Sequence, residues 1–532
     1  MSDADFDIIV VGSGCAGAVA AYVAASAGKS VLVVERGNYA GAKNMTGGRI
    51  YSHSLKEVFP DFESEAPLER KITHERIAML NSDSEMTIDF TSPVLAEEGK
   101  DSYSVLRGPF DQWLAEKAEG AGAEYICGIA VEELLKDESG KVVGIRAGED
   151  EITSQVVIVA EGTNTLLSER CLGNARPAPC QMAVGIKEVF ELPAGVIEDR
   201  FLLPEGEGAA MLFVGDCTHG KVGGGFLYTN RDSISLGLVA TISTAAGGGN
   251  DTPVYQMLED FKGHPAVAPI IRGAKMVEHS GHMVPEGGYD MVPQYVFDGA
   301  LLAGEAAGLC MNMGYQVRGM DFAVASGRMA AEAAVEAIDA GDASAAGLSG
   351  YARRMEDSFV IKDLKTFRKW PHVMEEWDAM FNDYPTMAAE VFNAMFSVDG
   401  RPQEPLRRRI MPIIKKPRAF QDRQRGEEGG ERAVSQIAPI TVNVDELIAV
   451  NKYEVDEESA HIELVEDPDI EEFKKLVRVC PAALYKIDED GATSFDYAGC
   501  LECGTCRIAC EGTIVRKWEN PQPTMGVEYR FG

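Results

Sequence analysis

Two short apolar runs with a small-residue segment between them open the chain and predict a strand, a helix and a second strand. Ile8–Val11 and Val31–Val34 consist entirely of strand-forming residues. Residues 18–27 between them are rich in alanine, which is typical of a helix that packs closely. Because fully apolar strands belong to a sheet that helices cover on both faces, this opening predicts an α/β fold.

Related patterns recur along the chain. An apolar run at 300–303 breaks on Gly304 into a helix, and residues 323–340 read as an alanine-rich helix. Residues 176–275 favour strands, with a strand pair across 227–239. Residues 345–400 have helical periodicity, and we interpret their aromatic side chains as packing onto the sheet rather than as a cofactor box: Phe359, Phe367, Trp370, Trp377, Phe381, Phe392 and Phe396.

Composition excludes some classes of function. The 50 Lys and Arg residues against 84 Asp and Glu residues give a net charge of −34, which argues against nucleic-acid binding. The sequence contains no apolar run long enough to span a bilayer and no basic-then-apolar start typical of a signal peptide. These features predict a cytoplasmic protein without a membrane-spanning helix.

The turn after the first strand carries the pattern G-x-G-x-x-G, at Gly12, Gly14 and Gly17. Strand, glycine turn and helix in this order form the phosphate-binding turn of dinucleotide folds, where helix N–H groups meet a pyrophosphate. Glu35 ends the second strand and is placed to accept hydrogen bonds from a ribose. An acid here favours a free 2′-hydroxyl, so the turn predicts FAD or NAD rather than NADP.

Five of the eleven cysteines gather near the end of the chain: Cys480, Cys500, Cys503, Cys506 and Cys510. The spacing of the last four matches the cysteine run of bacterial ferredoxins, and Pro481 follows the first. Five thiolates are too few for two clusters. We therefore assign Cys480, Cys500, Cys503 and Cys506 to one [4Fe–4S] cluster, with Cys510 as the spare. A structural zinc and a cluster that uses Cys510 in place of Cys480 are the alternatives.

The sequence offers no catalytic dyad or triad. It has only eight histidines, and we interpret His53, His279 and His282 as core or loop residues. No second strand-linked G-x-G-x-x-G is present, so the chain lacks a separate nicotinamide site. We therefore expect bound cofactors to carry the chemistry and a protein donor to supply the electrons.

Together these features resemble the electron-transfer-flavoprotein:quinone oxidoreductases, and most of all the bacterial Fix type. In that type the flavoprotein and ferredoxin-like subunits are normally separate, whereas here they would be fused. The motifs that carry the resemblance cover nearly the whole chain: Gly12–Gly17, Gly41–Gly48, Gly223–Asn230, His282–Gly288, Gly304–Gly308, Arg318–Asp321 and Cys480–Gly532. Glu161–Gly162 and Gly304–Glu305 depart from it, because Asp is usual at both acidic positions.

The resemblance implies a set of cofactor contacts. The expected FAD contacts are Gly12, Ser13, Gly14, Cys15, Ala16, Gly17, Glu35, Arg36, Lys43, Asn44, Gly47, Gly48, Arg107, Gly304, Glu305, Asn312 and Gly314. Within this set, Lys43, Asn44, Gly47 and Gly48 would lie beside the isoalloxazine ring. Gly223 and Gly224 match the glycine pair of the family's quinone pocket, and Tyr485 and Thr505 match residues that hydrogen-bond around the cluster.

The implied architecture is an α/β, FAD-binding Rossmann-like domain of the glutathione-reductase type, an inserted α+β quinone or substrate domain, and a ferredoxin-like [4Fe–4S] domain. We assign residues 1–50, 103–175 and 276–345 to the first, and 51–102, 176–275 and 346–410 to the second, with a helical cap. Residues 411–436 are a charged linker, and 437–532 form the third domain.

The implied function is electron transfer from a two-subunit, Fix A/B-like electron-transfer flavoprotein, which can be of the bifurcating kind, through FAD and one [4Fe–4S] cluster to a quinone. The resemblance also leaves open peripheral contact with the cytoplasmic face of the membrane. The alternative enzyme is a ferredoxin-linked flavin reductase of isoprenoid chains, similar to geranylgeranyl reductases. A further alternative, a scaffold or storage flavoprotein, predicts no turnover at all.

Overall fold

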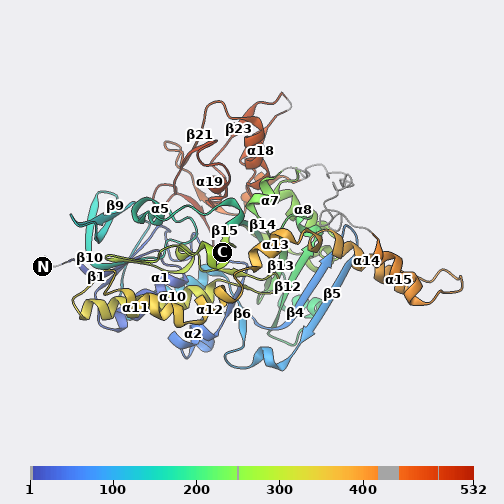
Figure 1. The fold of residues 1–532 in the computed structure, drawn as a ribbon, viewed down its shortest axis with the longest axis horizontal. Coiled ribbons are helices and arrows are strands. Elements are labelled where there is room, and N and C mark those ends of the chain that lie inside the picture. The colour runs from blue at the N-terminus through green and yellow to red at the C-terminus, as the bar shows by residue number, and fades with distance from the viewer. Residues whose placement is uncertain (1–3, 248–250, 417–441, 489) are drawn as a thin grey trace.

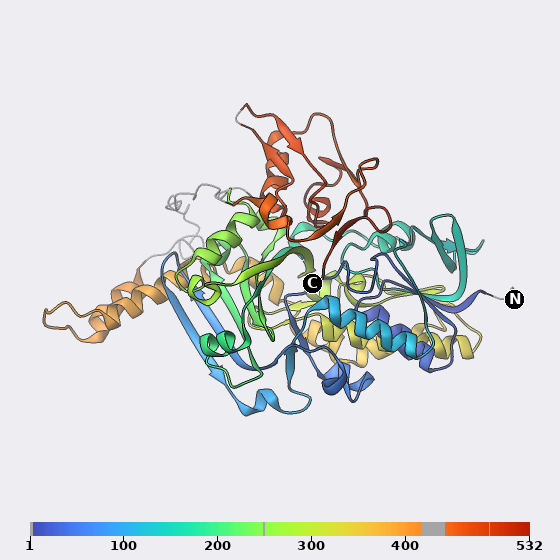
Figure 2. The ribbon, with the colours of Figure 1, turned by 180° about the vertical axis from the view of Figure 1, so that it is seen from behind.

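The computed structural model describes residues 4–247, 251–416, 442–488 and 490–532 of the 532. Two large sheets lie side by side, and a smaller C-terminal part, red in the ribbon, lies above both (Figures 1 and 2). Helices α14 (Asp383–Phe396) and α15 (Leu406–Lys415) extend away from this body at one end.

The first sheet has eight strands, six of them in the order β16-β17-β10-β1-β2-β7. Its four central pairings are parallel, and the residues of β1 and β2 are almost all buried. Long helices α1, α4 and α10 cover the sheet, which explains the absence of polar alternation in its strands. The elements of this region are β1 (Phe6–Val11), α1 (Cys15–Ser26), β2 (Val31–Glu35), α2 (His53–Val58), α3 (Phe62–Glu65), α4 (Arg107–Gly120), β7 (Glu124–Cys127), β8 (Glu133–Lys136), β9 (Val142–Ala147), β10 (Asp150–Val159), α5 (Leu166–Leu172), β16 (Val296–Phe297), β17 (Ala300–Leu302) and α10 (Met320–Asp339).

The second sheet has nine strands in the order β15-β11-β14-β13-β12-β4-β6-β3, with β5 paired to β4. All its pairings are antiparallel except that of β12 with β4. Helices α6 and α8 pack their apolar residues on one face. The elements are β3 (Arg49–Tyr51), β4 (Lys71–Leu80), β5 (Glu85–Thr91), β6 (Ser102–Ser104), β11 (Met182–Glu191), α6 (Ala194–Phe201), β12 (Glu207–Gly215), β13 (Gly223–Thr229), β14 (Ser233–Thr241), α7 (Ile242–Ala246), α8 (Val254–Gly263), α9 (Ala268–Ile271) and β15 (Lys275–Pro285).

Two of the expected domain limits need correction. Residues 276–285 were assigned to the FAD-binding domain, but they form β15, the edge strand of the second sheet. Helices α11 (Ser349–Asp357) and α12 (Phe359–Thr366) were assigned to the helical cap, but Tyr351, Met355 and Ile361 are buried in the core of the first sheet. The sequence does not determine either domain boundary, because the surface that each element packs against is set only by the tertiary fold.

In its described residues, the C-terminal part contains three short antiparallel strand pairs and three helices. Six of its elements follow one another as β21-α18-β22 and then β23-α19-β24, so that each half is a helix between two strands. Strand β21 pairs with β24, and β22 pairs with β23. Strands β20 and β25 pair beneath them. The elements are α17 (Val444–Ile448), β20 (Lys452–Glu454), β21 (Ile462–Leu464), α18 (Ile470–Val479), β22 (Tyr485–Ile487), β23 (Thr493–Phe495), α19 (Thr505–Cys510), β24 (Val515–Trp518) and β25 (Gly526–Glu528).

The last residues of the sequence pass between the two sheets. Gly108 N donates to Phe531 O at 3.0 Å, and the buried Lys187 Nζ donates to Gly532 O at 2.5 Å. A Cβ on Gly108 would lie 2.3 Å from Arg530 O. The C-terminal part is therefore packed against both large sheets and is not a tethered appendage.

Residues 370–416 form the arm and its root: α13 (Trp370–Glu376), α14 (Asp383–Phe396) and α15 (Leu406–Lys415). The expected linker at 411–436 is wrong at its start, because 411–415 complete α15; the remainder, 417–436, lies outside the described residues. The sequence did not predict this helix, because its run of arginines is typical of a solvated linker and Pro412 is unfavourable inside a helix. Within the described part of the chain, no helix has the length and apolar content needed to cross a bilayer.

Candidate functional site

The glycine turn between β1 and α1 has the backbone geometry that the sequence predicted. Gly12 has φ +93°, and a Cβ there would lie 2.5 Å from Ala160 O. A Cβ on Gly17 would lie 1.9 Å from Gly12 O, so its absence lets α1 pack against β1. In the part of the chain that the structure describes, no side chain caps the first turn of α1 and no acid lies in that turn, which leaves its N–H groups free for an anion.

A cavity of about 1340 Å³ opens onto this turn. Twelve of the expected FAD contacts line it: Gly12, Ser13, Gly14, Cys15, Ala16, Glu35, Arg36, Lys43, Asn44, Arg107, Gly304 and Glu305. Gly17 lies behind the wall, where it contacts Gly12. Thr163 Oγ1 and Asn164 Oδ1 also border the cavity; both are buried and have no hydrogen-bond partner among the described residues, so they fit a polar ligand.

The acidic and basic groups of this cavity are held by neighbours. Glu35 accepts N–H groups from Ser13 at 2.8 Å and Gly37 at 2.6 Å, so it braces the glycine turn as well as facing the cavity. Arg107 donates to Asp111 at 2.8 Å, and Asn44 donates to the same carboxylate at 2.7 Å. Asp111 thereby fixes both side chains at the wall.

Glu161, which replaces the usual Asp, also lines this cavity. Its carboxylate accepts the backbone N–H groups of Leu167 and Ser168, each at 2.8 Å, and so holds the start of α5. Burial raises the pKa of Glu161 to about 7. The extra methylene is accommodated because the carboxylate reaches into α5.

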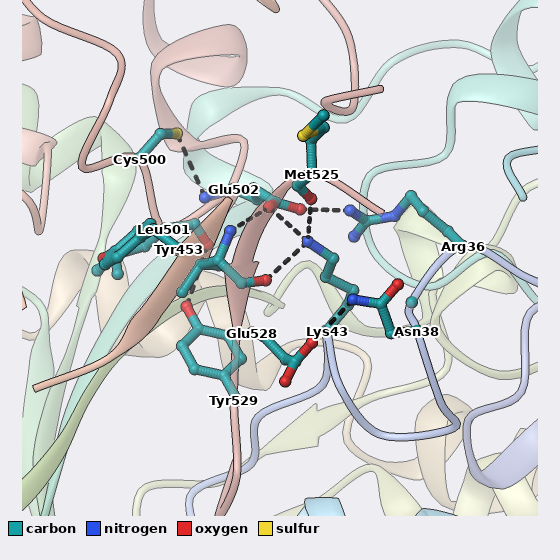
Figure 3. Close-up of polar contacts among 12 residues, drawn as sticks. Arg36, Asn38, Lys43, Tyr453, Cys500, Leu501, Glu502, Met525, Glu528 and Tyr529 are labelled. Atoms are coloured by element: carbon teal, nitrogen blue, oxygen red, sulfur yellow. Dashed lines mark hydrogen bonds and ion pairs between the residues drawn. The ribbon is translucent and has the colours of Figure 1, made fainter. Parts of the chain in front are cut away.

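Lys43 lies in the wall, but its amine is committed to the C-terminal part. It donates to Glu502 Oε1 at 2.8 Å and to Met525 O and Val527 O at 2.7 Å each (Figure 3). The sequence did not reveal that Leu501, Glu502 and Asn520 complete the wall. No motif could have shown this, because these residues reach the cavity only through packing of the C-terminal part.

A second, apolar cavity of about 1800 Å³ lies between the second sheet and α13. Besides Arg107 and Glu305, six expected contacts line it: Gly47, Gly48, Asn312 and Gly314, expected for FAD, and Gly223 and Gly224, expected for the quinone. Trp370 and Trp377, interpreted above as packing residues, also line it, as does Phe381. Trp370 does pack against the core of the first sheet, as that interpretation expected. The interpretation did not foresee that the three side chains also line a cavity, because helical periodicity cannot tell a cavity wall from a core contact.

The glycines of β13 have a structural reason of their own. A Cβ on Gly223 would lie 2.0 Å from Val239 O, and one on Gly224 would lie 2.6 Å from Phe213 O. Neighbouring strands therefore approach these positions closely, while the backbone of both faces the cavity.

The two cavities meet at a shared set of residues: Arg107, His282, Glu305, Gly319 and Met320. His282 Nε2 lies 3.5 Å from Glu305 Oε2 at this junction. Glu286 borders the apolar cavity, and burial raises the pKa of its carboxyl. Thus His282 lies at a junction of cavities and is not a core residue.

The C-terminal cysteines surround a third cavity, of about 310 Å³. Cys480, Cys500, Cys503 and Cys506 line it, whereas Cys510 Sγ lies 3.7 Å from Glu472 O and is not among its lining residues. Among the residues that the structure describes, no three His, Cys, Asp or Glu side chains converge tightly enough for a single metal ion. The four cysteines assigned as ligands thus line one cavity, and the spare does not.

Burial disfavours the charged form of these thiols. It raises the pKa of Cys480 to about 12 and that of Cys503 above its ordinary value. A metal that binds them as thiolates would have to offset this desolvation. The buried Tyr485 side chain interacts with Cys506, and Thr505 Oγ1 lies 3.3 Å from Cys503 Sγ. Both hydroxyls are thus beside the cavity, where the sequence placed them.

Comparison with known families agrees with this arrangement. Residues 7–167 match the FAD dependent oxidoreductase family, and residues 370–421 match the ETF-QO/FixC family C-terminal domain. The dinucleotide turn, its cavity and the first match define an FAD-dependent oxidoreductase.

Sequence similarity to curated proteins identifies the family within the FAD-dependent oxidoreductases. The chain is 49% identical over 417 residues to the probable electron transfer flavoprotein-quinone oxidoreductase YdiS of Escherichia coli, covering 78% of this chain and 96% of that protein. It is 48% identical to FixC of Escherichia coli, again covering 78% and 96%, and 39% identical to FixC of Bradyrhizobium diazoefficiens, covering 76% and 93%. The chain belongs to the ETF-QO/FixC family.

Solved structures share the fold at lower identity. A geranylgeranyl bacteriochlorophyll reductase-like protein from Thermoplasma acidophilum superposes with a TM-score of 0.58 at 20% identity, covering 77% of this chain and 96% of that one. The myxobacterial halogenase CndH gives a TM-score of 0.53 at 17% identity, covering 76% and 92%. At these identities the likeness shows the fold alone.

Proposed function

We propose that this chain passes electrons from a two-subunit electron-transfer flavoprotein through FAD and one [4Fe–4S] cluster to a quinone. The observation that carries this proposal is the contact between three cavities. The polar cavity at the glycine turn meets the apolar cavity at Arg107, His282 and Glu305, and Leu501 lines both the polar cavity and the cysteine cavity.

The first cavity is where FAD would bind. The free N–H groups of α1 and the guanidinium of Arg107 suit the pyrophosphate, and Glu35 suits the ribose. When bound, FAD supplies the exchange of electrons in pairs or singly. The chain's own contribution is to orient it, because Asp111 fixes Arg107 and Asn44 before any ligand arrives.

The second cavity is where the quinone would bind. Its walls are largely apolar and carry the aromatic side chains of the segment that matches the ETF-QO/FixC C-terminal domain. Reduction of a quinone takes up protons together with electrons. His282, Glu305 and Glu286 supply imidazole and carboxyl groups at this wall, close to the polar cavity.

The third cavity is where the cluster would bind, with Cys480, Cys500, Cys503 and Cys506 as ligands. The two-halved strand and helix order of the C-terminal part supports a ferredoxin-like fold for it, and Tyr485 and Thr505 would donate hydrogen bonds to the cluster's sulfur atoms.

The arm supports peripheral membrane contact. Phe396 is 74% exposed and Val398 76%, and the adjacent α15 carries exposed Arg407 and Arg408. Exposed apolar and basic residues together suit the surface of an anionic bilayer. Because α13 at the root of this arm lines the apolar cavity, a quinone could enter from that surface.

An anaerobic reconstitution tests the proposed function. The purified chain, with its FAD and iron measured, is reduced by NADH plus a matching two-subunit flavoprotein and then mixed with short-chain ubiquinone or menaquinone. We expect flavoprotein-dependent reduction followed by quinone-dependent reoxidation. Failure with both quinones would overturn the acceptor, and saturation of a geranylgeranyl chain with reduced ferredoxin would favour the isoprenoid reductase instead.

A further inference from the structure

One short stretch of chain separates the cavity at the glycine turn from the cysteine cavity. Leu501 lines both cavities, and Glu502 lines the first. Both residues lie between Cys500 and Cys503, so any movement of this stretch changes the separation of the two cavities. We call Leu501–Glu502 the dividing wall.

The dividing wall is held by an ion-pair cluster that joins segments far apart in the sequence. The Glu502 side chain is only 3% exposed and pairs with Arg36 and Lys43, both from the loop that follows β2. Glu502 Oε1 also accepts the Val527 N–H at 2.8 Å. Figure 3 shows the carboxylate between the arginine and the lysine.

The backbone of the dividing wall is fixed as well. Glu502 has φ +56°, a left-handed conformation that non-glycine residues adopt rarely. Its N–H donates to Cys500 Sγ at 3.3 Å, and Tyr529 Oη donates to Leu501 O at 3.1 Å. A residue in this conformation persists only where its surroundings determine it, which here means the ion-pair cluster and Tyr529.

Packing alone does not explain why Glu502, Arg36 and Lys43, rather than apolar residues, hold the dividing wall. A buried ion pair is often no more stable than apolar side chains of similar volume. Moreover, Arg36 and Lys43 both contact this one carboxylate, and Glu35 in the same cavity wall interacts electrostatically with both cations, so charges of both signs gather beside the cavities. These charges and the shared wall indicate a role in electron passage as well as in folding.

We propose that Glu502, Lys43 and Arg36 act as positioning residues that hold the dividing wall between the flavin and the cluster and set the charge balance for the electron that crosses it. This inference rests on the proposed function. One electron leaves one cofactor and reaches the other, and no covalent bond or further reactant is involved. Because all three side chains act through the wall and the local field, none of them is a catalytic residue.

The test measures the midpoint potential of the cluster by EPR-monitored titration of the whole protein. Glu502→Gln removes a negative charge and should raise the potential, because the added electron is then less repelled. Lys43→Met removes a positive charge and should lower it. In the double variant the net charge is that of the original, so its potential should return toward the starting value.

The matched control is Glu198→Gln, which removes an ion pair between α6 and Arg70, the residue before β4; neither residue lines any of the three cavities. It should leave the potential unchanged. Shifts of the same sign in Glu502→Gln and Lys43→Met, or no shift in either, would overturn the proposal. Merely looser packing cannot give opposite signs that cancel in the double variant.

Two further measurements separate the possible failures. If Glu502→Gln does not retain its cluster, Arg36→Gln and Lys43→Met still keep the carboxylate, and both should lower the potential. If the unmodified protein holds FAD but no iron–sulfur cluster after anaerobic purification, the cluster in the proposed function fails, and the positioning role of the three residues fails with it. Iron–sulfur signals without opposite shifts would overturn the positioning role alone.

Discussion

Gly17 shows how a single missing side chain lets the nucleotide turn form. Its α-carbon faces Gly12 O and the Val10 side chain so closely that a Cβ would lie 1.9 Å and 3.2 Å from them. Gly17→Ala should therefore push α1 away from β1, lowering the free energy of unfolding by about 1–3 kcal/mol and weakening FAD retention. Denaturant unfolding and the flavin absorbance of the purified protein measure both effects.

Gly120→Ala is the control for this substitution. Gly120 ends α4, and no atom lies within 4 Å of a Cβ built there. Alanine at this position should be neutral or slightly stabilising. Equal FAD retention in the Gly17 and Gly120 variants would contradict the tight helix–strand contact.

Glu161 gives a pH dependence whose sign follows from its raised pKa. The carboxyl ionises near pH 4.5 in the unfolded chain and near 7 in the folded one. Between these values the folded state binds the extra proton, so the contribution of Glu161 to stability is full below pH 4.5 and is lost as pH rises through 7. Glu161→Gln removes this dependence.

The Glu161→Gln variant should therefore gain stability relative to the parent as pH rises from 4.5 to 7, by at most about 3 kcal/mol. Thermal unfolding of both proteins across this range, at equal FAD occupancy, gives the difference. A constant difference across the range would contradict the raised pKa.

At the scale of elements, α19 distinguishes two cysteines that the sequence spacing treats alike. Cys506 faces the cysteine cavity, whereas Cys510 at the end of the same helix contacts Glu472 of α18. Cys480 comes from the other side, directly after α18. The fourth cavity-lining thiol therefore comes from the helix junction and not from the ferredoxin-like run.

This arrangement predicts different outcomes for two serine variants. Cys480→Ser should lose most of the cluster's iron and its visible absorbance after anaerobic purification, because a ligand is missing. Cys510→Ser should keep both close to the parent level. An intact cluster in Cys480→Ser would instead favour Cys510 as the fourth ligand.

At the scale of the whole molecule, charge is unevenly distributed. The chain carries a net charge of −34, yet α15 at the tip of the arm has three consecutive arginines, Arg407–Arg409. An acidic body disfavours general adsorption to anionic lipid, so any contact should be confined to this arm. The exposed Phe396 beside it adds an apolar anchor.

A combined Phe396→Ser, Arg407→Gln and Arg408→Gln variant should lose most of its co-sedimentation with anionic liposomes, and added salt should weaken binding of the parent in the same assay. Lys452→Gln with Lys474→Gln removes two exposed cations from the C-terminal part and serves as the control. Undiminished binding of the arm variant would exclude the arm as the contact.

The residues of the glycine turn could be predicted because their chemistry depends on near neighbours. Gly12, Gly14 and Glu35 lie on one strand–helix–strand unit, so their spacing alone places them on one cavity. The role of the aromatic side chains in residues 345–400 could not be predicted from their spacing. Trp370 and Trp377 have the same periodicity whether they pack against a sheet or border a cavity.

The sequence by itself determined the α/β start, the dinucleotide turn and the cysteine spacing, because each depends on backbone geometry within a few residues. Only the tertiary structure decided that β15 joins the second sheet and that Leu501 borders two cavities. It also joined Glu502 to Lys43 across 459 positions. Such contacts depend on which apolar surfaces and charged groups pack together in the folded protein, and local sequence patterns carry no information about this.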